Sequence, residues 1–335
     1  MDHRRVLTRL TCLAAALLLP LCALGEESPR GEVRILISAA GDCTLGGEVK
    51  SGIDRRFARS ADKHGLDWFL SNVRGIFASD DFTLVNLEGP LTTQTRYASK
   101  KYVMRGRPAY AAILSSSSVE VANLANNHTL DFGEQGYLDT QAALDGAGIG
   151  HCGGTAVFYG EKDGYTVGFL GFDQWNHTGS QAVAAVRAVR EKCDLIVVSM
   201  HWGEEYHYVR EGWQQKAGRA LIDAGADLVI GTHPHVIQGI ERYKGKYIVY
   251  SLGNFCFGGN TDPDDKDCYI FQQAFTLTEN GAADAGVRVI PCSVSSSASV
   301  NDYRPTPLSG DRANRLMKKI AGYSSVQGGK WLPED

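Results

Sequence analysis

Apolar, β-branched runs that end in metal-binding residue types constrain the fold of this chain more than any other feature. Residues 227–230 (Asp-Leu-Val-Ile) have the composition of a buried strand, and the Gly-Thr-His-Pro-His that follows places His233 and His235 just beyond it. In open α/β sheets, ligands bind at the edge where such strands end. A lone His-X-His pair occurs in many loops, but five other strand-like runs of this chain end in a similar way. The pattern predicts an α/β protein whose strand ends form one site.

The other five runs deliver carboxylate, amide and imidazole groups. These groups are Asp42 after residues 33–40, Glu88 after 82–85, Asn127 after 119–124, His201 after 195–200 and Asn254 after 247–251. Helical spacing occurs between the runs at residues 68–77, 136–147, 182–189 and 214–224. Alternating strands and helices predict a layered α/β architecture with the polar strand ends gathered on one side.

The residue types at these strand ends suit metal chemistry. Oxygen and nitrogen ligands without a thiolate are typical of zinc, manganese or iron sites, and a carboxylate such as Glu88 can bridge two ions. Two neighbouring ions stabilise the attacking and leaving oxygens of a displacement at phosphorus. Asp131 follows His128 by three residues and is suited to orient its imidazole. His128 is therefore predicted to donate a proton to the leaving group.

Composition and charge bear on the partners. The 335 residues are 43% hydrophobic and 21% charged, which is ordinary for a globular protein. The formal net charge is -4, and the sequence has neither zinc-finger spacing nor an arginine-rich helix, so nucleic acid is not expected as a partner. The negative charge also opposes long-range attraction of a polyanion, whereas bound metal ions would reverse the local field.

The first 25 residues have the pattern of a signal peptide. A basic stretch precedes an apolar run at residues 10–21, and Ala-Leu-Gly at 23–25 supplies small residues for cleavage. The apolar run is shorter than the roughly 20 residues that a membrane-spanning helix needs. We therefore expect an exported protein that begins near Glu26 and lies in the periplasm or another extracytoplasmic part of the cell envelope.

The expected domain spans residues 26–292, and the amino-acid composition of the chain changes after it. Residues 293–299 are rich in serine, Pro305 and Pro307 interrupt regular structure, and only residues 311–320 have helical spacing. We expect residues 293–335 to form a tail packed on the domain.

Six cysteines remain after the expected signal peptide, and none has CxxC spacing, so a structural zinc site is not expected. They are Cys43, Cys152, Cys193, Cys256, Cys268 and Cys292. An even number in an oxidising compartment allows a disulfide between Cys256 and Cys268 around a short loop. Buried free thiols are the alternative.

The motifs at the strand ends also resemble those of a known family. In chain order they are Gly-Asp at 41–42, Asn-Leu-Glu-Gly-Pro-Leu at 86–91, Ala-Asn-Asn-His-Thr-Leu-Asp-Phe-Gly at 125–133, His-Trp-Gly-Glu-Glu-Tyr at 201–206, Gly-Thr-His-Pro-His at 231–235 and Leu-Gly-Asn-Phe at 252–255. This series resembles the CapA family of poly-γ-glutamate capsule synthesis proteins, which is similar to the calcineurin-like metallophosphoesterases. The resemblance runs from Arg34 to Phe257. It implies a four-layer α/β/β/α sandwich with a metal site at one edge.

The resemblance implies roles for individual residues and one or two divalent ions of manganese, zinc or iron. By this resemblance the ligands are Asp42 and His235 for a first ion, Glu88 as a bridge, and Asn127, His201 and His233 for a second. His128 becomes the acid, with Asp131 behind it. Thr44 stands where the superfamily usually has a ligand histidine, and we hypothesise that Glu204 or Glu205 compensates. Arg105, Glu205 and Asn254 are predicted substrate contacts; an ordinary surface role is the alternative for Arg105.

Two classes of function follow from the resemblance. In the first, the protein is an exported metal-dependent hydrolase of capsular poly-γ-glutamate biosynthesis that cleaves a phosphoester or an amide. In the second, it is a non-catalytic accessory factor for synthesis, export or anchoring of the polymer. The expected partners are an anionic polymer or a phosphoester substrate, and a capsule-synthesis complex in the membrane.

Overall fold

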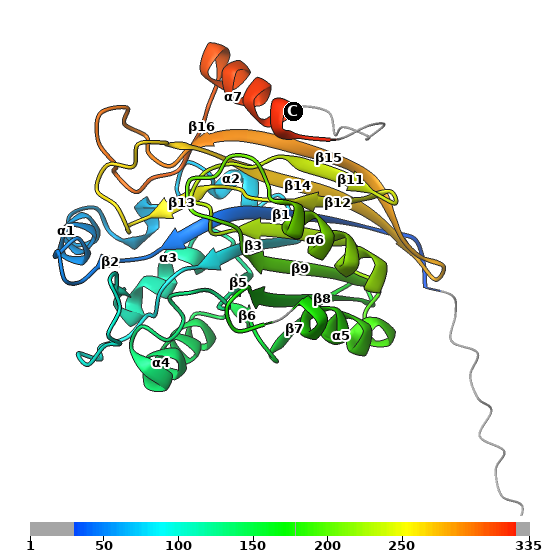
Figure 1. Cartoon of the computed structure of the whole chain (residues 1–335), viewed down its shortest axis with the longest axis horizontal. Helices are drawn as coiled ribbons and strands as arrows, with labels where there is room; N and C mark the ends of the chain where they lie inside the picture. The colour runs from blue at the N-terminus through cyan, green and yellow to red at the C-terminus, as the bar shows by residue number, and fades with distance from the viewer. Residues whose placement is uncertain (1–29, 178, 326–335) are drawn as a thin grey trace, which may run out of the picture.

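The structure is a computed structural model that describes residues 30–177 and 179–325. The predicted signal peptide, residues 1–25, lies outside the described residues, as do residues 326–335 of the predicted tail. Two large β-sheets and seven α-helices make up the described chain (Figure 1), so the predicted mixed α/β class is confirmed.

The larger sheet has eight strands. Its order is β16 (Thr306–Pro307), β15 (Gly281–Ser293), β14 (Asp267–Thr278), β1 (Val33–Thr44), β3 (Phe82–Leu87), β5 (Val121–Asn123) and β6 (Gly150–Cys152), and β13 (Asn254–Phe257) pairs with the end of β1. Strands β1, β3, β5 and β6 are parallel, whereas β14, β15 and β16 run antiparallel to their neighbours. The carboxyl ends of the parallel strands therefore share one edge of the sheet.

The second sheet has six strands and the same mixed character. Its order is β11 (Ile240–Tyr243), β12 (Lys246–Val249), β10 (Leu228–Thr232), β9 (Leu195–His201), β8 (Tyr165–Asp173) and β7 (Val157–Lys162). The central strands are parallel, and an antiparallel hairpin lies at each edge. Every residue of β9 and β10 is buried, as expected for parallel strands covered on both faces. A separate ribbon joins β2 (Gly47–Glu48) to β4 (Met104–Arg105).

Three hydrophobic cores hold the sheets and helices together. The core on one face of the larger sheet includes residues of α1 (Asp54–His64), α2 (Arg74–Phe77), α3 (Ala111–Ser115) and α4 (Gly133–Gly146). A second core joins the two sheets, with Ile37 and Leu84 on one side and Val197 and Ile230 on the other. The third core packs α5 (Gly179–Val189) and α6 (Gly212–Ala224) on the outer face of the smaller sheet. Short 3-10 turns at Leu66–Trp68, Pro108–Tyr110 and Arg190–Lys192 complete the described elements.

The helix expected at residues 311–320 extends over Gly310–Tyr323 and forms α7. Leu316 and Ile320 of this helix enter the core between the sheets. The chain beyond it is fixed to β11, because Ser325 N–H donates to Ile240 O at 2.8 Å. In the described part of the chain, no helix is long and apolar enough to cross a membrane.

The six described cysteines are free and buried, so the disulfide considered between Cys256 and Cys268 is wrong. Cys256 lies on β13 and its thiol donates to Tyr303 O at 3.3 Å. Cys268 lies on β14, opposite Cys292 of β15. Burial raises the pKa of the Cys292 thiol to about 12, which keeps it protonated and unreactive.

Candidate metal centre

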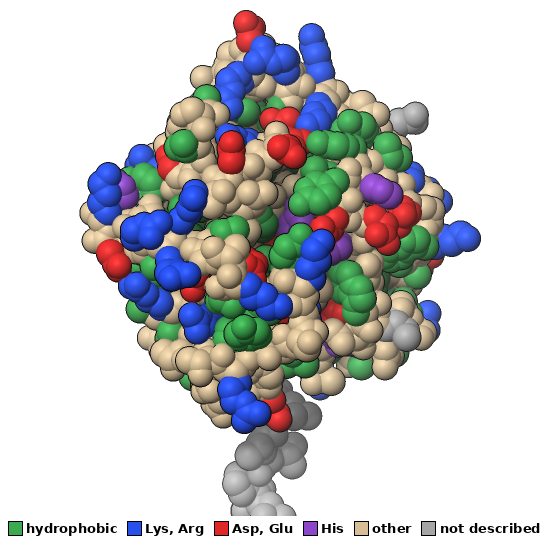
Figure 2. All heavy atoms as spheres, turned by 60° about the vertical axis from the view of Figure 1, so that its left-hand side comes forward, with side chains coloured by type: hydrophobic (Ala, Val, Ile, Leu, Met, Phe, Trp, Pro, Cys, Tyr) green, Lys and Arg blue, Asp and Glu red, His purple; other side chains and the backbone are tan. Residues whose placement is uncertain are grey.

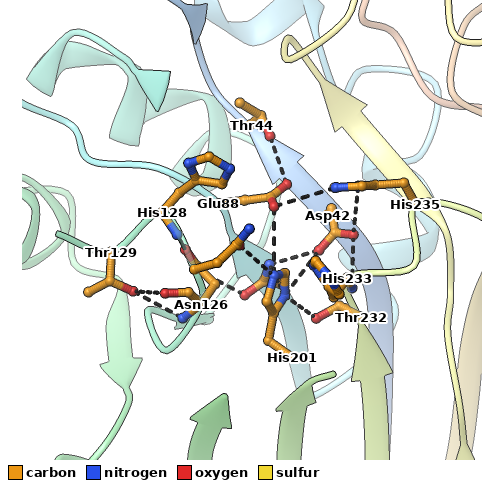
Figure 3. A network of polar contacts seen from close by, with 12 residues as sticks. Asp42, Thr44, Glu88, Asn126, His128, Thr129, His201, Thr232, His233 and His235 are labelled. Atoms are coloured by element: carbon orange, nitrogen blue, oxygen red, sulfur yellow. Dashed lines mark hydrogen bonds and ion pairs between the residues drawn. The ribbon is translucent and has the colours of Figure 1, made fainter. Parts of the chain in front are cut away.

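The predicted strand ends of the two sheets meet at one place, where carboxylate and imidazole side chains point toward one another (Figure 3). Asp42 is on β1 and Glu88 follows β3, both in the larger sheet. His201 ends β9 and His233 follows β10, both in the smaller sheet. Each of these four side chains is at most 4% exposed. The centre therefore lies across the junction of the two sheets and is drawn from segments far apart in the sequence.

Of the three groups of ligand atoms in the described chain that lie close enough to hold a metal ion, two share one carboxylate. The first is Asp42, Glu88 and His235, and the second is Glu88, His201 and His233; within each group the ligand atoms lie within 4.8 Å of one another. Asn127 lies beside the second group, with Oδ1 at 3.0 Å from His201 Nε2. The grouping matches the division into two sites that the resemblance implies, with Glu88 common to both.

Some buried polar atoms of the centre lack hydrogen-bond partners and are placed to bind a cation. Glu88 Oε1 and His233 Nδ1 are buried and have no hydrogen-bond partner among the described residues. Glu88 Oε1 lies 3.7 Å from both His201 Nε2 and His235 Nε2, which is beyond hydrogen-bond distance. An unsatisfied buried polar group costs about 1–3 kcal/mol, and more when it is charged. A divalent ion would satisfy these atoms, and nitrogen and oxygen donors without a thiolate suit zinc, manganese or iron.

The pKa values of the centre follow from burial and from the two carboxylates. Burial, reinforced by Asp42, raises the pKa of Glu88 above the usual carboxyl value. Burial and the neighbouring imidazoles lower the pKa of His201 well below its usual value and that of His233 to about 3. Burial alone would lower the pKa of His235, but Glu88 and Asp42 raise it to about 10. His201 and His233 are therefore neutral, the form that binds metal, and the carboxylates attract positive charge.

The Gly-Thr-His-Pro-His turn holds its two histidines in an uncommon backbone conformation. His233 has a backbone φ of 98° and His235 a φ of 58°, which are positive values that residues other than glycine rarely adopt. Hydrogen bonds compensate for the strain: His233 N–H donates to Asp42 Oδ2 at 3.2 Å, and Asn254 Nδ2 donates to His235 O at 3.1 Å. Strain of this kind is concentrated at functional sites.

A network of asparagines behind the centre, which the sequence analysis missed, orients the ligands. Asn86 Nδ2 lies 2.7 Å from Asp42 Oδ1 and 3.1 Å from His201 Nδ1, and Asn123 Nδ2 donates to Asn86 Oδ1 at 3.0 Å. Thr232 Oγ1 lies 3.0 Å from His201 Nδ1. Asn86 had a detectable signal, because it precedes Glu88 by two residues and alternate residues of a strand share a face.

His128 is held by a buried carboxylate that has two further partners. His128 Nδ1 lies 2.7 Å from Asp131 Oδ2, and the Asp131 side chain is fully buried. Met104 N–H donates to the same oxygen at 2.7 Å, and Lys100 Nζ donates to Asp131 Oδ1 at 2.6 Å and to Asn127 O at 2.5 Å. Lys100 was missed by the sequence analysis and carried no local signal, since it lies about 30 residues before its partner.

The structure separates the remaining candidates. Thr44 Oγ1 donates to Glu88 Oε2 at 3.2 Å, so the residue in place of the usual histidine supports the shared carboxylate. Glu205 forms a third group with His233 and His235, whereas Glu204 joins no such group in the described chain. Asn254 lies behind His235, with Oδ1 at 2.9 Å from His235 Nδ1. Arg105 is outside the centre and pairs with Asp54 at 3.3 Å.

Two exposed aromatic side chains border the centre and were also missed. Trp175 is 49% exposed and its ring meets that of His233 edge-on, with 4.7 Å between centroids. Tyr206 is 63% exposed and lies 6.4 Å from the His235 ring. Trp175 had a weak signal, because it lies two residues after the end of β8, as the ligands lie after their strands.

Fold and site together define an α/β protein with a buried cluster of carboxylates and histidines at a shared strand edge, whose ligand atoms lie close enough to hold a metal ion. The family described as "Bacterial capsule synthesis protein PGA_cap" has a model that matches residues 36–259. The chain belongs to this family, which confirms the resemblance found in the motifs.

Curated relatives support the same assignment. The chain is 32% identical over 236 residues to "PGA biosynthesis protein CapA" of Bacillus subtilis (strain 168), covering 63% of this chain and 62% of the relative. It is 27% identical over 344 residues to "Capsule biosynthesis protein CapA" of Bacillus anthracis, covering 93% and 79%. "Probable polyglutamine synthesis accessory protein Rv0574c" of Mycobacterium tuberculosis (strain ATCC 25618 / H37Rv) is 33% identical over 208 residues, covering 52% and 55%. The chain thus spans less than two thirds of the first and third of these relatives.

Among solved structures, the chain is similar to TT1561 of Thermus thermophilus. The TM-score is 0.40 at 12% sequence identity, covering 71% of this chain and 94% of that chain.

Proposed function

We propose that this protein is a metal-dependent hydrolase of the cell envelope that acts in poly-γ-glutamate capsule biosynthesis. The shared carboxylate is the main support for hydrolase activity. Glu88 belongs both to the group with Asp42 and His235 and to the group with His201 and His233. The printed names of the relatives support the process. The signal-like segment at residues 1–25 supports a location outside the cytoplasm.

For the fold, we propose the four-layer α/β/β/α sandwich of the calcineurin-like metallophosphoesterases. The three separate cores support this arrangement, since one lies between the sheets and each of the others joins a sheet to helices. Such a fold would place its site at the edge of the paired sheets, and the candidate metal-binding groups of this chain lie where strands of the two sheets end.

The proposed chemistry divides between the bound ions and the side chains of the chain. Divalent ions, when bound, supply Lewis-acid polarisation of the bond to be cleaved. Asp42 and His235 would hold one ion, and His201 and His233, with Asn127 beside them, would hold the other, while Glu88 is within reach of both groups. His128 donates a proton to the leaving group from Nε2, because Nδ1 is engaged by Asp131. Lys100 and Met104 N–H keep that carboxylate in place.

One observation favours a second candidate function. Thr44 occupies the place of a usual ligand histidine, which leaves the group of Asp42 and Glu88 with a single imidazole, His235. A protein with one weak ion site would serve as an accessory factor that binds the anionic polymer, or a membrane complex that makes it, without turnover.

Metal content and turnover, measured together, separate the two functions. Elemental analysis of protein purified without chelators should give two equivalents of a divalent metal, and His235→Ala should lower both the metal content and the hydrolysis of a generic phosphodiester. One equivalent or none, without turnover after metal is restored, would contradict the hydrolase and favour the accessory factor. Cleavage of poly-γ-glutamate, tested in parallel, distinguishes an amide from a phosphoester as the substrate.

A further inference from the structure

Positive charge is concentrated in two segments of this acidic protein. Helix α1 carries four basic residues and two acidic ones, and residues 92–110 carry five basic residues and no acidic one. The basic residues are Arg55, Arg56, Arg59 and Lys63 of α1, and Arg96, Lys100, Lys101, Arg105 and Arg107 of the second segment. With nine basic against two acidic residues these segments have a charge of +7, which leaves -11 for the rest of a chain whose total is -4. We call α1 and residues 92–110 together the basic surface.

Both acidic residues of the basic surface are already neutralised within it. Arg105 pairs with Asp54 at 3.3 Å, and Arg107 pairs with Asp62 at 2.7 Å. Six of the cations have no carboxylate within ion-pair distance among the described residues. These six are Arg55, Arg56, Arg59, Lys63, Arg96 and Lys101, and all are exposed. The positive charge of the surface is therefore free to act on a ligand.

A pocket of about 360 Å³ lies where the two segments meet. Its lining includes Arg55, which has no carboxylate partner among the described residues, the paired Arg105 and Arg107, the hydroxyl-bearing Thr92 and Thr93, and Asp54, the partner of Arg105. The volume is within the range of about 300–1,000 Å³ that is usual for ligand pockets. Arginine and hydroxyl donors in a concave site suit carboxylate groups, which arginine binds through two parallel hydrogen bonds.

The basic surface is connected directly to the metal centre. Lys100 and Met104, both in the second segment, donate to Asp131, which holds His128. The strand that carries Arg105, β4, pairs with β2, and β2 follows β1 just after Asp42 and Thr44. Figure 2 shows Lys and Arg side chains gathered on one side of this face, beside a central hollow in which histidine side chains are visible. A polymer chain bound along the basic surface would thus extend as far as His128 while still in contact with that surface.

We propose that the basic surface binds a polycarboxylate chain and leads it to the metal centre. The inference rests on the proposed function for the identity of the polymer, while the location of the binding surface comes from the charges and the pocket. Many separated cations suit a ligand with repeated charges better than a single anion. An inserted membrane helix is not favoured, because Phe57 and Ala61, the buried apolar residues of α1, face the core.

The test compares two matched charge-reversal variants in binding to fluorescent poly-γ-glutamate. Arg55→Glu/Arg59→Glu alters the basic surface, and Arg312→Glu/Arg315→Glu makes the same change on α7, where both arginines are also exposed. We expect the first variant to raise the Kd about tenfold or more at low salt and the second to leave it unchanged. Arg55→Lys/Arg59→Lys, which keeps the charge, should retain most of the affinity. Thermal melting of each variant verifies that it is folded.

Equal affinity in the α1 and α7 variants would overturn the proposal. So would an α1 variant that binds the polymer normally but loses binding to phosphatidylglycerol vesicles, because the surface would then contact a membrane. Equal binding of wild type to single-stranded polynucleotide and to the polymer would overturn the choice of a polycarboxylate. Failure of the proposed hydrolase is recognised separately, since it appears as missing metal or missing turnover while polymer binding through α1 persists.

Discussion

At the scale of single residues, Glu88 and Asp131 are the two carboxylates on which the centre depends, and their surroundings differ. Glu88 leaves Oε1 without a partner and faces two imidazoles, as a metal ligand does. Asp131 has both oxygens occupied, by His128, Met104 N–H and Lys100. The first is therefore suited to bind an ion, and the second to hold a proton donor in place.

Asp131→Asn should impair proton donation without unfolding the protein. The variant loses the negative charge that holds His128, so we expect turnover of a phosphodiester with a poor leaving group to fall by roughly 100-fold. Turnover of an activated ester should fall much less, because a good leaving group needs no proton. The control is Asp145→Asn, on the exposed side of α4. Equal loss for both substrates would show that Asp131 acts on folding or metal binding instead.

Asp80 should make stability depend on pH. Burial raises its pKa to about 7, although Thr83 Oγ1 donates to it at 2.7 Å. A carboxyl with a raised folded pKa binds its proton more tightly in the folded state, so stability falls as pH rises from about 4 to about 7. Each unit of pKa shift corresponds to about 1.4 kcal/mol. Chemical denaturation should show that the free energy of unfolding falls less steeply with pH for Asp80→Asn than for wild type, whereas the exposed Asp311→Asn should follow wild type. Parallel pH dependences for Asp80→Asn and wild type would contradict the raised pKa of Asp80.

At the scale of elements, the sequence allowed the strand ends to be predicted but not the way in which distant segments pair. Asp42, Glu88, His201 and His233 were predicted because each follows a mainly apolar, strand-like run, which is a local signal. Lys100 was not predicted, because it follows no such run and its partner Asp131 lies 31 residues further along the chain. Trp175 was missed although it lies two residues after the end of β8. The pairing of β1 with β13 and the ribbon of β2 with β4 are likewise set by contacts between remote segments, which periodicity does not encode.

Gly231→Ala should disturb the seam between β10 and the chain after β12. A Cβ at Gly231 would lie 2.0 Å from Tyr250 O, the oxygen that accepts the Trp202 Nε1–H hydrogen bond. The same Cβ would lie 2.5 Å from Trp202 Nε1. The backbone oxygen and the buried indole cannot move aside easily, so we expect a loss of about 1–3 kcal/mol or more in the free energy of unfolding. We also expect weaker metal binding by the adjoining histidine turn. The control is Gly146→Ala in α4, where a Cβ would meet nothing within 4 Å. Equal stability of the two variants would contradict this account.

At the scale of the whole molecule, the centre and the basic surface both join parts of the chain that sequence order separates. The centre joins the two sheets, because Asp42 and Glu88 come from one and His201 and His233 from the other. The basic surface joins α1 to residues 92–110, and its charge of +7 is hidden in a total of -4. The net charge opposed attraction of a polyanion only because it averages over the surface, whereas a ligand meets the local field.

Removing metal should loosen the junction of the sheets and lower the melting temperature. A ligand that binds only the folded state stabilises it by about 2.7 kcal/mol at 100 times its Kd, and here the loss would also expose the mutual repulsion of Asp42 and Glu88. We expect a chelator to lower the Tm of wild type by about 5 °C or more, and added manganese or zinc to restore it. His233→Ala removes one ligand of the second group, so its melting temperature should respond less to the chelator. If wild type and this variant melt identically with and without chelator, and elemental analysis finds no metal in either, Glu88 and the three histidines are not a metal centre.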